Sequence, residues 1–320
     1  MNPKGKNKFL LLQIQLEMTN LSLGEFPRQP SQGRKFLSRQ TEIIPMKTIR
    51  DEFVFGTRVP VTRLTAPLSY EAATLEQRQA RLTVRRKEAD TADEIPASGW
   101  AYVDSRSIKL LPEGAKFQPG LIYDFSYPAK NPTILGIGFA ASRDLVSFLR
   151  YAVRDSVGSA NPIAVGKESP GIKTALAIGV SQSGRYLRDH IESGFNQDES
   201  KRKVFDGVLA HTAGIGKVFA NFEFGQPNRT NTQHEDHHFP ENQFPFAHTK
   251  LTDPLTGKSG ALLRGDGFDP LVMEVNTSTE YWQKGASLLH TDPLGTRDVA
   301  IPNSVRVYMI GYGTEMKSCL

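Results

Sequence analysis

The feature that most constrains this chain is a turn rich in glycine and serine between a buried strand and a helix. An apolar run over residues 174–178 predicts the strand, and residues 184–192 carry a helical pattern. Gly179, Ser181 and Ser183 lie between the two. Small residues two places before and after a serine suit a strained strand-to-helix turn, because larger side chains there would collide with the strand or the helix. The stretch therefore predicts a serine presented at a tight turn.

Such a turn is the nucleophile elbow of α/β-hydrolases, whose usual pattern is G-x-S-x-G. Here Ser183 stands at the last position of the pattern and Gly184 follows it. An ordinary strand-to-helix turn is the alternative interpretation, since glycine and serine are common in such turns. If the elbow forms, Ser181 is the nucleophile. The backbone N–H of Gln182, at the start of the helix, is then one oxyanion donor, favoured by the helix dipole.

Apolar strands alternate with helical patterns from residue 121 onward, which predicts an α/β fold with a largely parallel sheet flanked by helices. The expected strands are Leu121–Tyr127, Thr174–Ile178, Val204–Ala210, Leu271–Val275 and Val305–Ile310. Residues 217–268 lack this alternation and are expected to form a cap insertion. We therefore expect a loosely ordered extension over residues 1–45 and one α/β-hydrolase domain over residues 50–320.

The composition limits the classes of partner. The 320 residues carry a formal net charge of +5, and 38% of them are hydrophobic. No apolar run approaches the roughly 20 residues that span a bilayer, and no long basic stripe indicates a nucleic-acid partner. Cys319 is the single cysteine, so an intrachain disulfide and a cysteine-based metal site are excluded.

The location and assembly of the protein are less constrained. Residues 4–12 combine lysines with a short apolar stretch, but no small-residue cleavage site follows them. The sequence as written therefore favours a cytoplasmic location, while secretion of a full-length parent protein stays open. The oligomeric state is open as well.

Four stretches carry a resemblance to a known family: GIGFAASRDLVSFL at 136–149, GVSQSGR at 179–185, NQFPF at 242–246 and NTSTEYW at 276–282. Together they resemble an uncharacterised bacterial family of "alpha/beta hydrolase domain" proteins over roughly residues 81–311. The resemblance implies the α/β-hydrolase fold and an esterase-type activity, and we expect a small-molecule carboxylic ester as the class of substrate. It implies no particular substrate, and the reaction requires no cofactor.

Hydrolases of this fold place the catalytic groups in the chain order serine, acid, histidine. Glu280 follows the strand expected at residues 271–275 and is the candidate acid, with a solvated glutamate at a helix start as the alternative. The resemblance implies a Gly-Thr-x-His stretch after the last strand. This chain has Gly313, Thr314 and Met316 at those positions and ends at Leu320. We therefore expect a truncated or altered C-terminus and an impaired esterase, with an inactive homologue or binding module as the alternative.

Two further residues complete the candidate site. His211 follows the strand 204–210 and points toward the same sheet edge as the turn, so it is a possible substitute base. The second oxyanion donor is expected after the strand 121–127, which suggests Tyr127.

Two other motifs compete with this interpretation. Residues 136–141 match the relaxed dinucleotide fingerprint G-x-G-x-x-A, but no acidic residue ends a second strand about 20 positions later, so a dinucleotide-dependent oxidoreductase is less favoured. The cap contains His234, His237 and His238 beside two acidic residues. This composition suits a metal, yet a solvated polar loop explains it as well, and we expect no metal.

Overall fold

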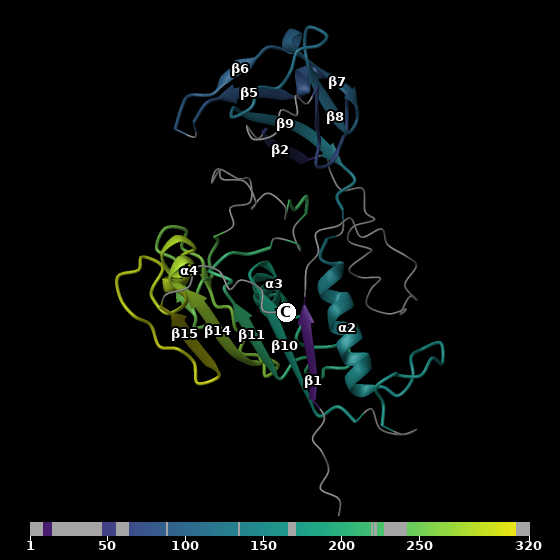
Figure 1. Cartoon of the computed structure of the whole chain (residues 1–320), viewed down its shortest axis with the longest axis vertical. Coiled ribbons are helices and arrows are strands. Elements are labelled where there is room, and N and C mark those ends of the chain that lie inside the picture. Colours follow the sequence, from purple (N-terminus) through teal and green to yellow (C-terminus); the bar gives the residue numbers. More distant parts are fainter. Residues whose placement is uncertain are drawn as a thin grey trace, which may run out of the picture. The chain divides into compact units, whose positions relative to one another are not determined.

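The computed structural model describes residues 9–14, 47–55, 64–87, 89–133, 135–165, 171–218, 220, 223–226 and 242–311. The chain divides into two compact units. The first, here called the α/β unit, contains Met1–Gln29, Gly136–Phe219 and Glu241–Leu320. The second, here called the β unit, contains Pro30–Leu135 and Ala220–Pro240. Figure 1 shows the elements of both units.

The α/β unit is built on a five-stranded parallel sheet with the strand order β1-β10-β11-β14-β15. Its strands are β1 (Phe9–Ile14), β10 (Thr174–Val180), β11 (Gly207–His211), β14 (Leu271–Thr277) and β15 (Val305–Ile310). Because all neighbours run parallel, the carboxyl ends of the five strands meet at one edge. Residues that follow the strands are therefore gathered at this edge.

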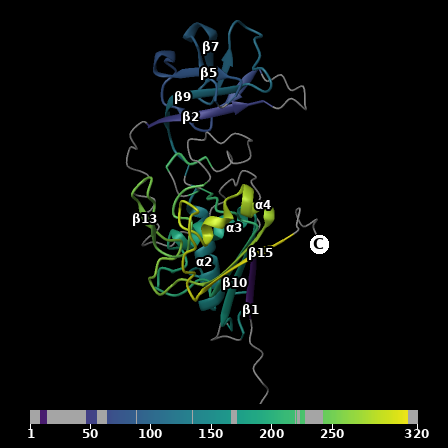
Figure 2. The same ribbon diagram turned by 90° about the vertical axis from the view of Figure 1, so that its left-hand side faces the viewer.

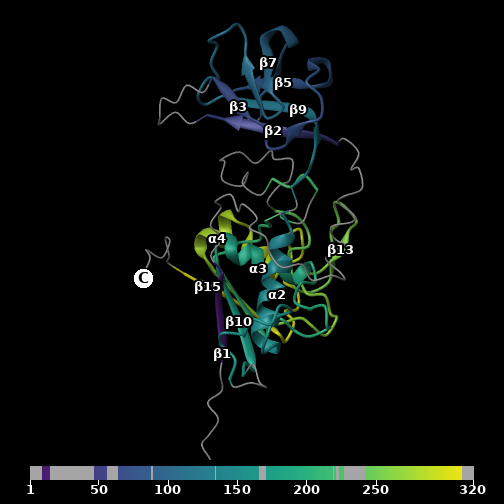
Figure 3. The ribbon, with the colours of Figure 1, turned by 90° about the vertical axis from the view of Figure 1, so that its right-hand side faces the viewer.

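Helices cover one face of this sheet. The α/β unit contains α2 (Ile137–Tyr151), α3 (Gln182–Glu192), α4 (Ser278–Gln283), the 3-10 helix η4 (Ala286–Leu289) and the short strands β12 (Leu251–Thr252) and β13 (Ser259–Gly260). Figures 2 and 3 show α2 and α3 on the same side of β10. Along β10, Ala175 and Ala177 are buried, whereas Leu176 and Val180 are 36% and 46% exposed. The opposite face thus presents apolar side chains, which is unusual for a parallel sheet.

The β unit consists of two antiparallel sheets. One contains β2 (Lys47–Val54), β9 (Ile122–Lys130), β5 (Arg81–Arg85) and β6 (Asp93–Ile95), with β4 (Glu71–Ala72) beside β9. The other contains β3 (Thr65–Pro67), β8 (Ser107–Leu110) and β7 (Trp100–Asp104), and two 3-10 turns, η1 (Gln77–Gln79) and η2 (Ala97–Gly99), connect strands. Trp100 packs edge-on against Phe125, with ring centroids 5.0 Å apart, so the two sheets share an aromatic core.

A short segment from the middle of the chain completes that core. Phe224 is 1% exposed and packs edge-on against Tyr70 with ring centroids 5.0 Å apart. The Tyr70 hydroxyl donates to the carbonyl oxygen of Gly225. Of the expected cap at 217–268, the described residues 223–226 thus pack in the β unit, whereas residues 242–268 belong to the α/β unit.

Three expectations about the organisation need correction. The strand expected at Leu121–Tyr127 lies in the antiparallel sheet of the β unit, paired with β2 and β5, and is no part of the parallel sheet. A single domain over residues 50–320 is replaced by two units with separate cores. Residues 9–14, expected in a loosely ordered extension, form β1 at the edge of the parallel sheet, in register with β10. Hydrophobic patterns predict strands but do not specify which strands pair.

No helix in the ranges described above is long and apolar enough to cross a membrane.

Candidate active site

Ser181 occupies the turn between β10 and α3. Its backbone has φ 55° and ψ −118°, a conformation that residues other than glycine rarely adopt. Ser181 is the N-cap residue of α3, yet its side chain makes no capping hydrogen bond, and the residue is exposed. Serine at this position usually caps its helix through the hydroxyl. The Ser181 hydroxyl is therefore accessible and not committed to the helix.

Close packing around the turn accounts for its small residues. A Cβ atom on Gly179 would lie 2.4 Å from the Ser183 carbonyl oxygen, and one on Gly184 would lie 2.9 Å from the Ala213 Cβ. Ser183 itself is tolerated in a buried position, 6% exposed. Close packing thus requires glycine at Gly179 and at Gly184. The second of these positions lies one place later than the last glycine of the usual motif.

The sheet brings His211 to the same turn. His211 ends β11 in register with Val180, and its carbonyl oxygen accepts a 2.8 Å hydrogen bond from the Ser181 N–H. The Nδ1 atom of its ring lies 3.3 Å from the Thr212 hydroxyl. The structure therefore places the backbones of Ser181 and His211 side by side at the carboxyl edge of the sheet.

Gln182 begins α3, so its backbone N–H is one of the donors that the helix itself leaves without an intrahelical acceptor. This is the position expected for the first oxyanion donor, directly after Ser181.

Glu280 lies in the first turn of α4, just after β14, and has a structural role there. Its Oε2 accepts a 3.0 Å hydrogen bond from the Thr277 N–H while the Thr277 side chain accepts from the Glu280 N–H, which forms a capping box. The Thr277 hydroxyl also donates to Glu280 Oε2. Burial and the charge of Arg188 lower the pKa of Arg185 on α3 to about 10, and the charges of Asp189 and Glu280 oppose this shift. The carboxylate of Glu280 therefore acts electrostatically on the helix that begins after Ser181.

Tyr127, expected as a backbone oxyanion donor, uses its side chain in the core of the β unit. It lies in β9 of the β unit, fully buried, where its hydroxyl donates to Asp51 Oδ2 at 2.9 Å and accepts from the Tyr70 N–H at 3.2 Å. Burial and the charge of Asp51 raise the pKa of this hydroxyl. Because the strand 121–127 is not part of the parallel sheet, the reason for assigning Tyr127 to the oxyanion site no longer holds.

Several candidate positions lie outside the described residues: Met316, Cys319, His234, His237 and His238. Among the residues that are described, no group of three or more His, Cys, Asp or Glu side chains is arranged to hold a metal ion.

A buried polar cluster beside the turn was not foreseen from the sequence. Arg188 of α3 is 2% exposed and donates to the carbonyl oxygens of Gly214 (2.6 Å), Ala213 (3.2 Å) and Gly216 (3.3 Å) in the segment after β11. Its Nε lies 3.9 Å from Glu274 Oε1, which also lies 3.2 Å from His248 Nε2. This cluster fixes the segment that packs against Gly184.

The "Alpha/beta hydrolase domain" family matches residues 85–311, more than half of the chain. The chain belongs to this family. The matched range covers β10, Ser181, α3, β11, β14, α4 and β15, together with part of the β unit. No curated protein and no solved structure matches the chain.

The glycine-rich stretch at residues 136–141 lacks the setting of a dinucleotide site. It opens α2, and the strand before it along the chain is the antiparallel β9 of the β unit. A dinucleotide fingerprint connects a strand of a parallel sheet to a helix of the same unit. The structure provides no such connection here.

Proposed function

We propose that this member of the alpha/beta hydrolase domain family is a serine hydrolase of esterase type, with Ser181 as its nucleophile and a small carboxylic ester as its substrate. The observation that carries the proposal is the conformation of Ser181, with positive φ between β10 and α3, an exposed side chain and a hydroxyl that does not cap the helix. Strained residues of this kind persist where the surrounding structure holds them, and they are common at active sites.

The proposed reaction is acyl transfer to water. The Ser181 Oγ attacks the ester carbonyl carbon while a base takes the hydroxyl proton, and the backbone N–H of Gln182 donates to the oxyanion that forms. The alcohol leaves with a proton, and water then hydrolyses the acyl group from Ser181. The dipole of α3 favours negative charge at this position.

The general base is the catalytic group of the proposed site that has the least support. The family resemblance implies a histidine at the position of Met316, and His211 is the described histidine whose backbone adjoins Ser181. Glu280 would orient the imidazole, but its Oε2 already accepts two hydrogen bonds from Thr277. We therefore expect slow turnover, because the members of a catalytic triad act as a unit and the residual rate comes from the oxyanion site and binding.

Hydrolysis of p-nitrophenyl acetate and butyrate tests the proposal. The unmodified chain, Ser181→Ala, Met316→His and His211→Asn are compared, with Ser200→Ala as the control because Ser200 is another exposed serine. We expect Met316→His to raise the rate by about tenfold or more, since a positioned general base contributes roughly 10²–10⁴-fold. Adding Ser181→Ala should remove that gain, and Ser200→Ala should change nothing.

Unchanged rates of ester hydrolysis would favour the alternative function. If Met316→His gains no activity, and if folded Ser181→Ala and the unmodified chain hydrolyse both esters at the same rate, the esterase proposal fails. The chain is then better described as an inactive homologue or binding module. A selective loss in His211→Asn would identify His211 as the substitute base.

A further inference from the structure

The strand β15 forms one edge of the parallel sheet. Its neighbour on one side is β14, and no described strand lies on its other side. Val305, at its start, is buried, but Tyr308, Met309 and Ile310 are 50%, 55% and 47% exposed. Successive side chains of a strand point to opposite faces of the sheet. The second half of β15 is therefore exposed on both faces as well as along its outer edge.

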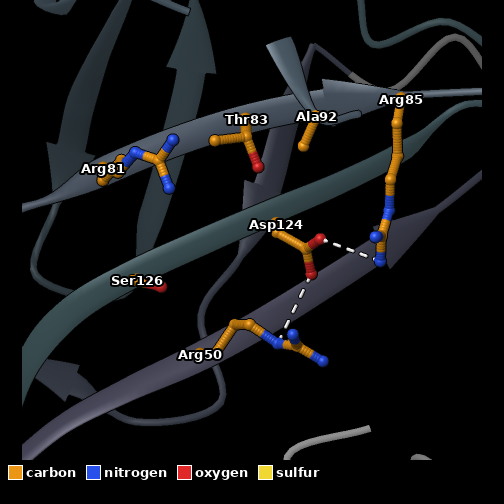
Figure 4. Close-up of a pocket in the computed structure, with 7 residues that line it drawn as sticks. All are labelled: Arg50, Arg81, Thr83, Arg85, Ala92, Asp124 and Ser126. Carbon is orange, nitrogen blue, oxygen red and sulfur yellow. Dashed lines mark ion pairs between the residues drawn. The ribbon is translucent and has the colours of Figure 1, made fainter. Parts of the chain in front are cut away.

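The edge strands of the β unit differ from β15 because they carry several charged residues. The outer strands of the larger sheet there are β2 and β6. Arg50 of β2 forms an ion pair with Asp124 of β9, with 3.5 Å between Nε and Oδ1, beside the cavity that Figure 4 shows. Two of the three residues of β6 are Asp93 and Glu94. Charged side chains on an edge strand oppose its pairing with another chain.

The strand β15 has little of this protection. Its one charged residue is Arg306, whose guanidinium group donates to the carbonyl oxygens of Asn303 (3.1 Å) and Val305 (2.7 Å). The charge is thus held near the start of the strand. Residues 307–310 contain no charge and no proline, and three of the four are β-branched or aromatic, which favours a strand. An apolar edge of this kind is a template for pairing with a further strand.

The backbone of β15 also directs hydrogen-bonding groups away from the sheet. The Val272 N–H of β14 donates to the Ser304 carbonyl oxygen at 2.8 Å. In a parallel ladder the backbone groups of alternate residues face the neighbouring strand, so every second residue from Ser304 onward bonds to β14. In the second half of the strand, the residues between them are Val307 and Met309. Their N–H and C=O groups therefore point outward.

We propose that two copies of this chain pair antiparallel through β15, with Tyr308 at the twofold axis. In this register Val307 lies opposite the partner's Met309, and Met309 lies opposite the partner's Val307. Each of these pairs exchanges two backbone hydrogen bonds, as hydrogen-bonded pairs of antiparallel strands do. The two parallel sheets thereby become one continuous sheet.

The side chains of β15 suit a second copy of the same strand. A twofold contact joins the same surface of both copies, so the strand must be complementary to itself. In the proposed register Tyr308 faces the partner's Tyr308, and Arg306 faces the partner's Ile310. An aromatic pair across strands is favourable, and no two like charges lie opposite each other. The proposal rests on the α/β unit alone and is independent of the function of Ser181.

Sedimentation velocity of the full chain over a range of concentrations tests the proposal. Tyr308→Lys places two positive charges opposite each other at the axis. Met309→Pro removes one outward N–H, and edge strands tolerate proline at such positions. Leu255→Lys is the control, because Leu255 is 84% exposed between β12 and β13 of the same unit. Circular dichroism melts verify that each variant is folded.

We expect a dimer whose population rises with concentration. Tyr308→Lys and Met309→Pro should each raise the Kd of dimerisation by about tenfold or more, whereas Leu255→Lys should leave it unchanged. An unmodified chain that stays monomeric at every concentration would overturn the proposal. Equal association of all folded variants would also overturn it, and would direct attention to another surface, such as the opposite sheet edge at β1.

Disulfide formation tests the register without adding a charge. In a Cys319→Ser background, Tyr308→Cys should give a disulfide-linked dimer under mild oxidation. Facing residues of a non-hydrogen-bonded antiparallel pair have Cα atoms about 4.5 Å apart, and disulfides join Cα atoms about 4.4–6.8 Å apart. Leu255→Cys in the same background is the control and should stay monomeric. If Tyr308→Cys forms no more cross-linked dimer than Leu255→Cys does, the proposed pairing is wrong.

Discussion

At the residue scale, two ionisable groups of α3 lie buried next to each other with opposite consequences for stability. Burial raises the pKa of Asp189 to about 6, although the Val218 N–H donates to its Oδ2 at 2.7 Å and lowers the pKa in part. Burial lowers the pKa of His190 to about 3, so His190 is neutral in the native state near neutral pH. Their contributions to the pH dependence of unfolding therefore oppose each other.

Replacing Asp189 isolates its contribution to the pH dependence of unfolding. The native state binds the Asp189 proton more tightly than the unfolded state, so its contribution to stability falls as pH rises from about 4 to about 6. Asp189→Asn keeps an oxygen for the Val218 N–H and carries no charge. At each pH, the free energy of unfolding of the unmodified chain is subtracted from that of Asp189→Asn. This difference should be larger at pH 7.5 than at pH 4, by up to about 3 kcal/mol. Urea unfolding at both pH values measures the difference, and a constant difference would refute the account of Asp189.

Single residues also show what the sequence can and cannot reveal. Ser181 and Gln182 are found from the sequence because their signal is local: a strand, small residues and a helix within a few positions. The pair of Glu274 and His248 was missed because its partners are 26 residues apart in the chain. Glu274 occupies an inward position of β14, which the run of apolar residues around it does not distinguish from an outward one.

At the scale of elements, the junction of β10 and α3 depends on glycine for close packing. Gly179→Ala should distort the turn and lower stability by several kcal/mol, since its Cβ would lie 2.4 Å from a backbone oxygen. Gly138→Ala in α2 is the matched control, because its Cβ meets nothing within 4 Å and alanine favours the helix by about 1 kcal/mol. Thermal unfolding of both variants checks the prediction. A neutral Gly179→Ala variant would contradict the packing described for the turn.

The types of most elements follow from the sequence, whereas their partners do not. The strands β10, β11, β14 and β15 and the helix α3 lie close to their expected positions. The strand β9 alternates apolar and polar residues, a pattern typical of an antiparallel sheet with one solvated face, so the sequence already carried a signal against its expected place in the parallel sheet. The strand β1 was missed because a short apolar run flanked by polar residues becomes a strand only when β10 is beside it.

At the scale of the whole molecule, the chain contributes β1 to the α/β unit, forms most of the β unit, and then adds α2, β10, α3 and β11 to the α/β unit. It returns to the β unit at residues 223–226 before it completes the α/β unit. The sequence indicated an insertion here, but the return of Phe224 to a distant core is a long-range contact that no local pattern encodes. Phe224 packs against Tyr70 and anchors this segment in the core of the β unit.

Truncation of the Phe224 side chain should therefore affect only the β unit. Phe224→Ala is expected to destabilise the β unit by about 3–5 kcal/mol, the usual cost of removing a fully buried phenyl ring. Hydrogen exchange followed by mass spectrometry should show faster exchange in β2 and β9 and unchanged exchange in β10 and α3. Phe244→Ala removes the ring that packs against Phe246 in the α/β unit. It should speed exchange in β10 and α3 and leave exchange in β2 and β9 unchanged. Equal effects on both units would contradict the division into two cores.

The central claim is that Ser181 is a nucleophile, and covalent labelling tests it most directly. A fluorophosphonate reagent transfers its phosphonyl group to an activated serine oxygen with loss of fluoride. Intact and peptide mass spectra are recorded for the unmodified chain, Met316→His, Ser181→Ala and the control Ser200→Ala. The account predicts one adduct on the peptide containing Ser181, faster in Met316→His, retained in Ser200→Ala and absent in Ser181→Ala. No adduct in the folded unmodified chain and in Met316→His, or an adduct that persists in Ser181→Ala, would contradict it.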